Sequence, residues 1–412
     1  MRLLKNLPRS MAVAALAVTV SLPVMAQNVK FFSWYGTETE TYTSQLIEKA
    51  KKLGVTLDVE PVVWDQMQPL LQARIAAGTM PDLLDFKGQD IATYAPAGTL
   101  LDLTGQEWLK NIPEGARANL KVDGKEYAVP YTAAFQGVFY NRKVFEKHGI
   151  KTPTTYAELM EVASALKAKG VTPFATHFKD NWNIGNITMQ FAMSEVFNEN
   201  PKWGDDLYAN KVTFEGTEGY RKVFQHVKDL ADNSWKDTFS VDFTEASKRF
   251  VKGEAAMFVT GTWVNSNLTI DPTFDYGVFP FPGTKAGAKL IFEPNHTWAV
   301  SAKTANKAAV LKVLEMVATD KQLAATVVDE AGAYSLINGV KSEKKPRPVD
   351  KDIDAAKAAN NIIDVSIGNN QIKWAYQEEY SKLIAEWLLG KRSLDDALKG
   401  ATALRTSVTR AK

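Results

Sequence analysis

Two spacings of hydrophobic positions alternate along the first part of the chain after residue 26. Short apolar or alternating runs at 29–35, 57–63 and 82–86 predict strands. Between these runs, apolar residues recur every three or four positions at 42–53 and 70–76, which predicts helices. Strand and helix in regular alternation predict an α/β fold whose sheet is mainly parallel and whose crossovers are right-handed.

The later part of the chain continues the same patterns less regularly. Strands are expected at 127–131 and 138–140, and Pro130 should limit regular pairing because proline has no N–H to donate. Thr155 and Glu158 have the spacing of a capping box, which predicts a helix start at residue 156. The remaining predicted elements are strands at 255–260, 276–279 and 298–301, and helices around 310–317 and from 369 to the end of the chain.

The stretch GEAAMFVTGTW, residues 253–263, combines a buried-strand pattern with a tight turn. Ala255 to Thr260 is apolar, and Gly261 permits a turn before Trp263. In an open α/β sheet the carboxyl ends of the strands face the ligand crevice. Trp263 therefore either packs into the core or offers its flat face to a ligand.

Residues 1–26 have the pattern of a secretory signal peptide. Arg2, Lys5 and Arg9 give a positive start, an apolar run follows, and Val24-Met25-Ala26 supplies small residues for cleavage. The apolar run is too short to span a bilayer. The sequence therefore predicts an exported protein, most naturally a periplasmic one.

Composition excludes several classes of protein. The chain has 49 basic and 47 acidic residues, and residues 1–26 hold three of the basic ones, so the mature chain carries about −1. That balance argues against a nucleic-acid-binding protein, which usually shows a basic excess. There is no cysteine, which excludes disulfides and a lipid-modified N-terminal cysteine. The mature length suits two or three domains, which are large enough to be stable without disulfide bonds.

The search for catalytic motifs is mostly negative. The four histidines form no H-E-x-x-H pair, GTKAGAK at 283–289 lacks the P-loop spacing, and there is no G-x-S-x-G elbow. Asp350, Asp352 and Asp354 resemble a calcium loop, but Ala355 and Asn361 replace its glycine and its final glutamate. We expect no metal and no cofactor. A glycosidase needs only two carboxylates at the right separation, and that alternative stays open.

Aromatic and planar polar residues gather where the first three predicted strands end. A sugar has an apolar C–H face and a rim of hydroxyls, so its site needs flat aromatic faces beside planar hydrogen-bonding groups. Taken singly, Phe86 and Trp64 are expected in the core. The whole set is Trp34, Tyr35, Trp64, Asp65, Gln66, Asp85, Phe86 and Gln89.

Four segments resemble extracellular solute-binding proteins of the carbohydrate-transporter class, the family of maltose-binding protein. They are AAGTMPDLLDF at 76–86, GKEYAVPYT at 124–132, VFYNRKVFEKHGIKTPTTYAELM at 138–160 and GEAAMFVTGTW at 253–263. The resemblance implies a two-lobed periplasmic-binding-protein fold of type II-like topology, with the ligand in the cleft between the lobes. It also implies delivery of a sugar to a membrane permease, and no catalysis.

The resemblance also implies where the ligand is contacted. One departure is that many relatives have a Gly-Gly pair where this chain has Asn295-His296, so these two side chains are either specificity contacts or structural groups. The implied carbohydrate contacts are Trp34, Tyr35, Glu38, Phe86, Gln89, Trp182, Asn183, Trp263 and Trp374, and we add Asp65, Asn295 and His296 as candidates.

The sequence thus predicts a monomeric receptor for a mono- or oligosaccharide that works with the permease subunits of an ABC importer. The expected first lobe comprises 27–135 plus 297–337, and the second comprises 136–296 plus 338–412. An exported carbohydrate-active enzyme is the main alternative. A receptor for a polyol phosphate such as glycerol-3-phosphate is a lesser one, because the candidate site residues include no Arg or Lys.

Overall fold

The computed structural model describes residues 27–35, 39–365 and 374–406, and in this part of the chain one mixed sheet joins all the strands. The main strand order in the ten-stranded sheet is β2-β1-β3-β8-β4-β6-β5. The strands are β1 (Gln27–Ser33), β2 (Val55–Pro61), β3 (Leu83–Phe86), β4 (Ala128–Asn141), β5 (Thr172–Ala175), β6 (Ala255–Gly261), β7 (Tyr276–Phe279), β8 (Leu290–Val300), β9 (Tyr334–Ser335) and β10 (Ile362–Asp364).

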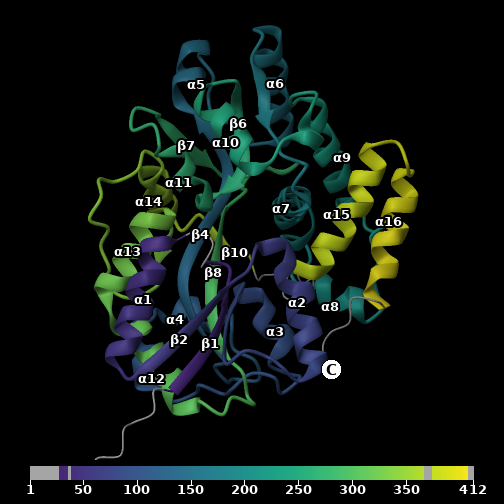
Figure 1. Ribbon diagram of the computed structural model, residues 1–412. Helices are drawn as coiled ribbons and strands as arrows, with labels where there is room; N and C mark the ends of the chain where they lie inside the picture. The colour runs from purple at the N-terminus through teal and green to yellow at the C-terminus, as the bar shows by residue number, and fades with distance from the viewer. Residues whose placement is uncertain (1–26, 36–38, 366–373, 407–412) are drawn as a thin grey trace, which may run out of the picture.

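Helices cover the sheet (Figure 1). Thr155 caps α6 as predicted, in a complete capping box with Glu158. The α-helices are α1 (Glu40–Lys52), α2 (Trp64–Ala77), α3 (Ile91–Tyr94), α4 (Glu114–Ala118), α5 (Arg142–His148), α6 (Tyr156–Ala168), α7 (Asn181–Ala192), α8 (Trp203–Tyr208), α9 (Glu218–Asp232), α10 (Phe243–Val251), α11 (Asn265–Leu268), α12 (Lys307–Thr319), α13 (Lys321–Ala331), α14 (Asp350–Ala358), α15 (Trp374–Leu388) and α16 (Leu394–Ala403). Short 3-10 turns lie at Gly88–Asp90, Glu107–Asn111, Thr238–Ser240, Thr262–Val264 and Leu404–Thr406, and a π-helical turn lies at Met193–Phe197.

The first three strands form the predicted βαβαβ unit. β1 pairs in parallel with both β2 and β3. The expectation of a mainly parallel sheet holds for this unit but is wrong for the sheet as a whole, because β8 pairs antiparallel with β3 and β4, and β4 pairs antiparallel with β6 and β7. Two further pairs are parallel, β5 with β6 and β10 with β8.

The strand β4 differs from the sequence prediction. The two strands predicted at 127–131 and 138–140 are one 14-residue strand, buried along its whole length. Shifts in the register with β8 between Pro130 and Ala133 absorb the proline, because the extra residue of a bulge needs no ladder hydrogen bond. β8 likewise begins at Leu290, well before the predicted start at residue 298.

The hydrophobic core is divided into two parts, which we call the first and second lobe. Buried residues of the first lobe come from 29–133 and 298–337. Those of the second lobe come from 135–291 and 349–401, in two adjoining clusters. In Figure 1 β4 and β8 run through both lobes, so the two lobes share these strands.

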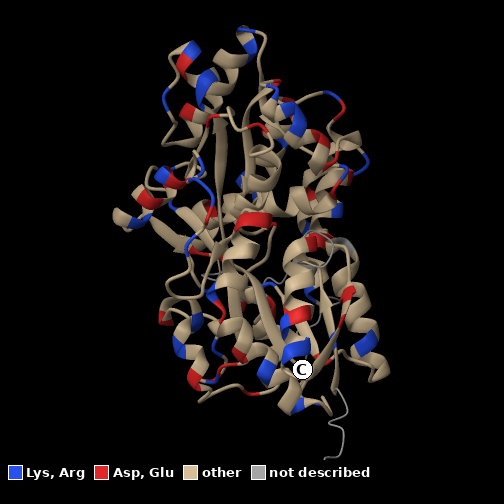
Figure 2. Cartoon of the chain, turned by 60° about the vertical axis from the view of Figure 1, so that its left-hand side comes forward, with Lys and Arg blue, Asp and Glu red and all other residues tan. Residues whose placement is uncertain are grey.

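The surface carries charge of both signs. Figure 2 shows Lys and Arg interspersed with Asp and Glu over both lobes. Across the described residues, each helix falls short of the length or the apolar character that a bilayer-crossing helix requires.

Candidate functional site

A cavity of about 500 Å³ lies where the two lobes meet, and tryptophans from both lobes line it. Trp34 and Trp64 come from the first lobe, Trp182 and Trp263 come from the second, and part of β8 lies between them. The lining residues are Trp34, Trp64, Lys87, Asp180, Trp182, Asn186, Asp242, Phe243, Thr244, Trp263, Ser266, Asn267, Glu293, Asn295, His296 and Ala331.

Three of these residues stand at the carboxyl ends of the parallel strands. Trp34 directly follows β1, Lys87 directly follows β3, and Trp64 begins α2 just after β2. The rings of Trp34 and Trp64 lie with their centres 3.9 Å apart. Because these strand ends meet at one edge of the sheet, the alternating sequence pattern brings the three side chains together.

Gly261 explains why Trp263 faces the cavity. Trp263 lies in the short turn after β6, and its ring covers the Cα of Gly261 so closely that a Cβ at position 261 would overlap the six-membered ring. The φ of Gly261 is −131°, an ordinary extended value. Glycine is therefore needed here for space rather than for backbone freedom.

Lys87 lies inside a cage of aromatic rings. Its Nζ is 4.9 Å from the ring centre of Trp34, 5.5 Å from that of Trp64 and 5.3 Å from that of Trp263. The side chain is only 9% exposed. An ammonium within about 6 Å of an aromatic face is attracted by the ring quadrupole, and most strongly where water is excluded. One cation therefore joins aromatic side chains of both lobes.

Polar groups on β8 complete the surroundings of Lys87. Its Nζ donates to Asn295 Oδ1 and lies 3.5 Å from Glu293 Oε2. Burial raises the pKa of the Glu293 carboxyl, Asp364 adds to the rise, and Lys87 opposes it. The pair places one positive and one negative charge in the floor of the cavity, each largely compensated by the other.

A chain of buried amides extends from Glu293 into the second lobe. Gln136 Nε2 donates to Glu293 Oε2 at 2.6 Å, and Asn186 Nδ2 donates to Gln136 Oε1 at 2.8 Å. Gln190 Nε2 then donates to Asn186 Oδ1 at 2.9 Å and to the carbonyl of Thr260 at 3.2 Å. The amides of Gln190, Asn186 and Gln136 thus form one chain of hydrogen bonds that ends on Glu293, and this chain fixes the orientation of each amide.

His296 supports Trp34 from behind. Its ring stacks on Tyr35 with the centres 3.2 Å apart. Both Trp34 Nε1 and Asp85 Oδ2, the latter at 2.8 Å, lie within hydrogen-bonding reach of His296 Nδ1. Burial, with a smaller contribution from Lys87, holds the pKa of His296 well below its usual range. His296 is thus a neutral group that positions the Trp34 ring.

Two carboxylates line the side of the cavity formed by the second lobe. Asp180 Oδ2 accepts from the Phe243 N–H at 2.6 Å and lies 2.9 Å from His177 Nδ1. Asp242 caps α10 by accepting from the Glu245 N–H at 3.0 Å. Both acids thus have structural partners.

Five of the predicted site residues line this cavity: Trp34, Trp182, Trp263, Asn295 and His296. Three others are buried elsewhere. Tyr35 lies behind His296, Phe86 packs on Tyr94 with ring centres 5.0 Å apart, and Asn183 accepts from the His177 N–H. Glu38 and the side chains of Asp65, Gln89 and Trp374 lie outside the described part of the structure.

The sequence patterns did not mark five of the lining residues, which are Lys87, Asp180, Asn186, Asp242 and Glu293. Trp64 was expected in the core, and it lines the cavity instead. Lys87 and Trp64 follow predicted strands, so the same strand-end argument that selected Trp34 applied to them as well. Asn186 lies inside a helix and Glu293 inside a strand, where no local pattern marks them. The candidate residues named from the sequence include no Arg or Lys, whereas Lys87 lines this cavity.

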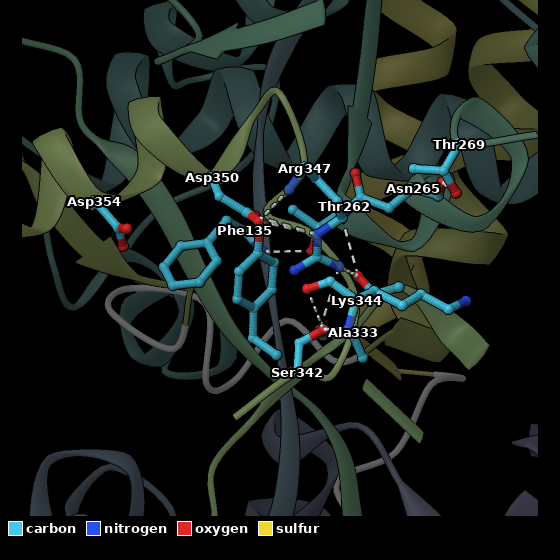
Figure 3. A network of polar contacts seen from close by, with 12 residues as sticks. Phe135, Thr262, Asn265, Thr269, Ala333, Ser342, Lys344, Arg347, Asp350 and Asp354 are labelled. Carbon is cyan, nitrogen blue, oxygen red and sulfur yellow. Dashed lines mark hydrogen bonds and ion pairs between the residues drawn. The ribbon is translucent and has the colours of Figure 1, made fainter. Parts of the chain in front are cut away.

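A second cavity, of about 990 Å³, is lined by Phe135 of β4, Tyr334 of β9 and the loop before α14. Arg347 is one of its lining residues, and Figure 3 shows Arg347 within a network of polar contacts. The guanidinium donates to the carbonyls of Gly332 and Ala333, pairs with Asp350 and lies 4.3 Å from the Tyr334 ring centre. These polar groups already satisfy one another, so the 500 Å³ cavity is the better candidate for a ligand site.

The comparisons with known proteins agree with this arrangement. A family model described as bacterial extracellular solute-binding protein matches residues 34–324. The chain therefore belongs to this family of solute-binding proteins, whose members work in the periplasm or outside the cell. Within the described residues, no cluster of three His, Cys, Asp or Glu side chains is arranged to hold a metal ion.

Individual relatives are distant in sequence. The chain is 26% identical to the multiple sugar-binding protein of Streptococcus mutans over 289 residues, 67% of each chain. It is similar in structure to a chitin oligosaccharide binding protein, with a TM-score of 0.78, 21% identity and 94% and 100% of the two chains covered. The complex of the solute-binding protein RafE with raffinose gives a TM-score of 0.74 at 20% identity, covering 91% of this chain and 98% of that one. The predicted two-lobed α/β fold is confirmed.

We predict that Gly261→Ala destabilises the protein by about 1–3 kcal/mol, because the new methyl group must displace the Trp263 ring. In a Trp263→Ala background the same substitution should cost little, since the ring that it would meet is gone. Urea unfolding of the four proteins of this cycle measures the coupling. Equal costs of Gly261→Ala in both backgrounds would contradict the packing described here.

We predict that Lys87→Met destabilises the protein more at pH 8 than at pH 5. The pKa of the Glu293 carboxyl is raised in the folded protein above its ordinary value of 4.5. Such a group contributes stability in full at pH values below 4.5, and this contribution is lost as the pH rises through the raised pKa. Without Lys87 the pKa of Glu293 rises further, so the loss should approach about 3 kcal/mol at pH 8.

The double variant Lys87→Met/Glu293→Gln serves as the control, because it removes both charges and should recover most of this loss. The free energy of unfolding of each variant is measured in urea at both pH values. A Lys87→Met loss that does not change with pH would show that Glu293 does not depend on Lys87.

Proposed function

We propose that this protein is the sugar receptor of an ABC importer, which binds a mono- or oligosaccharide in the 500 Å³ cavity and delivers it to membrane permease subunits. The observation that carries the proposal is the lining, in which four tryptophans stand beside amide and carboxylate groups. Flat aromatic faces suit the C–H faces of sugar rings, and planar polar groups suit their hydroxyls. The relatives named for sugars, and the raffinose complex, support the same ligand class.

The charges of the cavity favour an uncharged ligand. Lys87 is paired with Glu293, and Asp180 and Asp242 add negative charge at the wall. A phosphate would need an uncompensated cation or several free N–H donors. A polyol phosphate therefore meets an unfavourable field here, although the cavity contains a lysine.

An exported carbohydrate-active enzyme is the second candidate. Such an enzyme would need two carboxylates free to act as acid and base across one bond. In this cavity Glu293 pairs with Lys87 and accepts a hydrogen bond from Gln136. Asp180 and Asp242 accept hydrogen bonds from backbone N–H groups in the first turn of α10. Incubation with labelled raffinose and chitotriose separates the candidates, since a receptor returns both sugars unchanged.

We further propose the lobe boundaries predicted from the sequence, 27–135 plus 297–337 and 136–296 plus 338–412. The division of the buried clusters supports these boundaries, and the chain then crosses between lobes near 134–137, 294–297 and 338–346. Ligand binding between two lobes commonly closes them as rigid bodies about a few hinge residues. Residues 1–26 would direct export to the periplasm and be removed, and the mature protein would act as a monomer.

We predict that Trp263→Ala weakens sugar binding about tenfold while leaving the melting temperature of the ligand-free protein nearly unchanged. Covering about 60 Å² of apolar sugar and ring surface is worth roughly 1.5 kcal/mol, which is about tenfold in affinity. Isothermal titration with raffinose and chitotriose measures the affinity. Phe86→Ala is the matched control, because its ring is fully buried in the first lobe and its loss should lower stability. Unchanged affinity in Trp263→Ala would remove Trp263 from the site.

We predict that a sugar that binds also makes the protein more compact. The free protein should be mainly open, and the sugar shifts the equilibrium because it binds the closed form better. Small-angle scattering with and without saturating sugar should show a smaller radius of gyration in its presence. An unchanged radius with a bound sugar would indicate a rigid, preformed site instead.

A further inference from the structure

The hydrogen bonds around Lys87 leave two polar atoms of the cavity floor available to a ligand. Both bonds that Glu293 accepts end on Oε2, and within the described residues Oε1 accepts none. Asn295 uses Oδ1 to accept from Lys87, and its amide nitrogen makes no hydrogen bond to any described residue. Since an amide nitrogen carries two donors and a carboxylate oxygen is an acceptor, the floor offers one donor group beside one acceptor.

Lys87 fixes the positions of both atoms. One ammonium contacts Asn295 Oδ1 and Glu293 Oε2 at the same time, so a single side chain orients both groups, and both residues line the same cavity. The three tryptophan rings keep the ammonium in place. Two adjacent ring hydroxyls present a matching pair, because each hydroxyl can donate or accept.

We propose that Glu293 and Asn295 are the specificity-determining contacts of the cleft, which bind two adjacent hydroxyls of an uncharged sugar ring, and that Lys87 is the positioning residue that holds them. This inference rests on the proposed function. Its consequence is that the site rejects sugar acids. A carboxylate on the ring would meet Glu293, and the charge of Lys87 is already compensated by that residue.

Glu293→Gln should change the specificity in a characteristic direction. The substitution keeps the shape and an acceptor for Lys87 and Gln136, but it removes the negative charge and leaves the ammonium uncompensated. Binding of neutral raffinose or chitotriose should weaken about tenfold, because a charge-assisted hydrogen bond is lost. Binding of digalacturonate, a sugar acid, should strengthen at least tenfold. A merely structural role of Glu293 would weaken the binding of all three sugars.

The double variant Lys87→Met/Glu293→Gln tests whether the change in specificity comes from the uncompensated charge of Lys87 or from the altered side chain at position 293. This variant removes both charges, so neutral sugars should bind about tenfold more weakly and digalacturonate should gain nothing. Lys49→Met/Asp320→Asn is the matched control, because it removes a partly exposed lysine–carboxylate pair that does not line the cavity. Its affinities should equal those of the unmodified protein.

A pH profile of raffinose and chitotriose binding tests the positioning role of Lys87. The charged groups that act on the Glu293 carboxyl are Lys87, directly after β3, and Asp364 on β10. In Lys87→Met the carboxyl loses its cation and takes up a proton at higher pH, which changes the acceptor Oε1 into a donor. The acid-side loss of sugar affinity should therefore begin at higher pH in Lys87→Met than in the unmodified protein, and Lys87→Met/Glu293→Gln should lack it.

The experiment is isothermal titration of the folded mature protein and these variants with raffinose, chitotriose and digalacturonate. If the unmodified protein binds a neutral probe and Glu293→Gln has the same affinities for all three probes, the inference is overturned and the proposed function stands. Tighter binding of digalacturonate than of the neutral probes by the unmodified protein also overturns the inference. If the unmodified protein binds neither neutral probe, the proposed function fails and the inference fails with it.

Discussion

The antiparallel pairing of β4 with β8 is the constraint on which the rest of the molecule depends. The two strands pair from Ala128 with Ala299 to Gln136 with Ile291, and in doing so they pass from one lobe into the other. Gln136, Glu293, Asn295 and His296 all lie on these strands. The polar floor of the cavity therefore lies on two paired strands, whose register shifts between Pro130 and Ala133, while aromatic side chains line the cavity from both lobes.

The ion pair between Lys87 and Glu293 is costly to bury, and polar and aromatic groups around it offset this cost. Removing two charges from water costs several kcal/mol each unless partners replace the water. Here the aromatic cage and Asn295 surround the ammonium, and Gln136 donates to the carboxylate. The hydrogen bond from Asn186 to Gln136 continues this polar network into the second lobe. A well-packed apolar floor would be as stable, but it would offer no polar atoms to a hydroxylated ligand.

Local patterns predicted the scaffold, and the family resemblance supplied most of the five predicted site residues among the sixteen that line the cavity. The βαβαβ unit, the capping box of α6 and the strand before Trp263 follow from spacing and turn chemistry, which act over a few residues. Lys87 was missed because a lysine is almost never buried without a partner, and its partner Glu293 lies 206 residues away in the chain. Asn186 becomes a site residue only through its contact with Gln136 on another element. The single strand β4 was split in the prediction because a bulge that accommodates Pro130 leaves no local signal.

The most direct test of the account is a crystal structure of the mature protein with bound raffinose or chitotriose. We expect a sugar ring in the 500 Å³ cavity, with Trp34 or Trp263 against one face and two adjacent hydroxyls hydrogen-bonded to Glu293 Oε1 and the Asn295 amide. A sugar bound in the 990 Å³ cavity around Arg347, or one that leaves the β8 groups untouched, would contradict it.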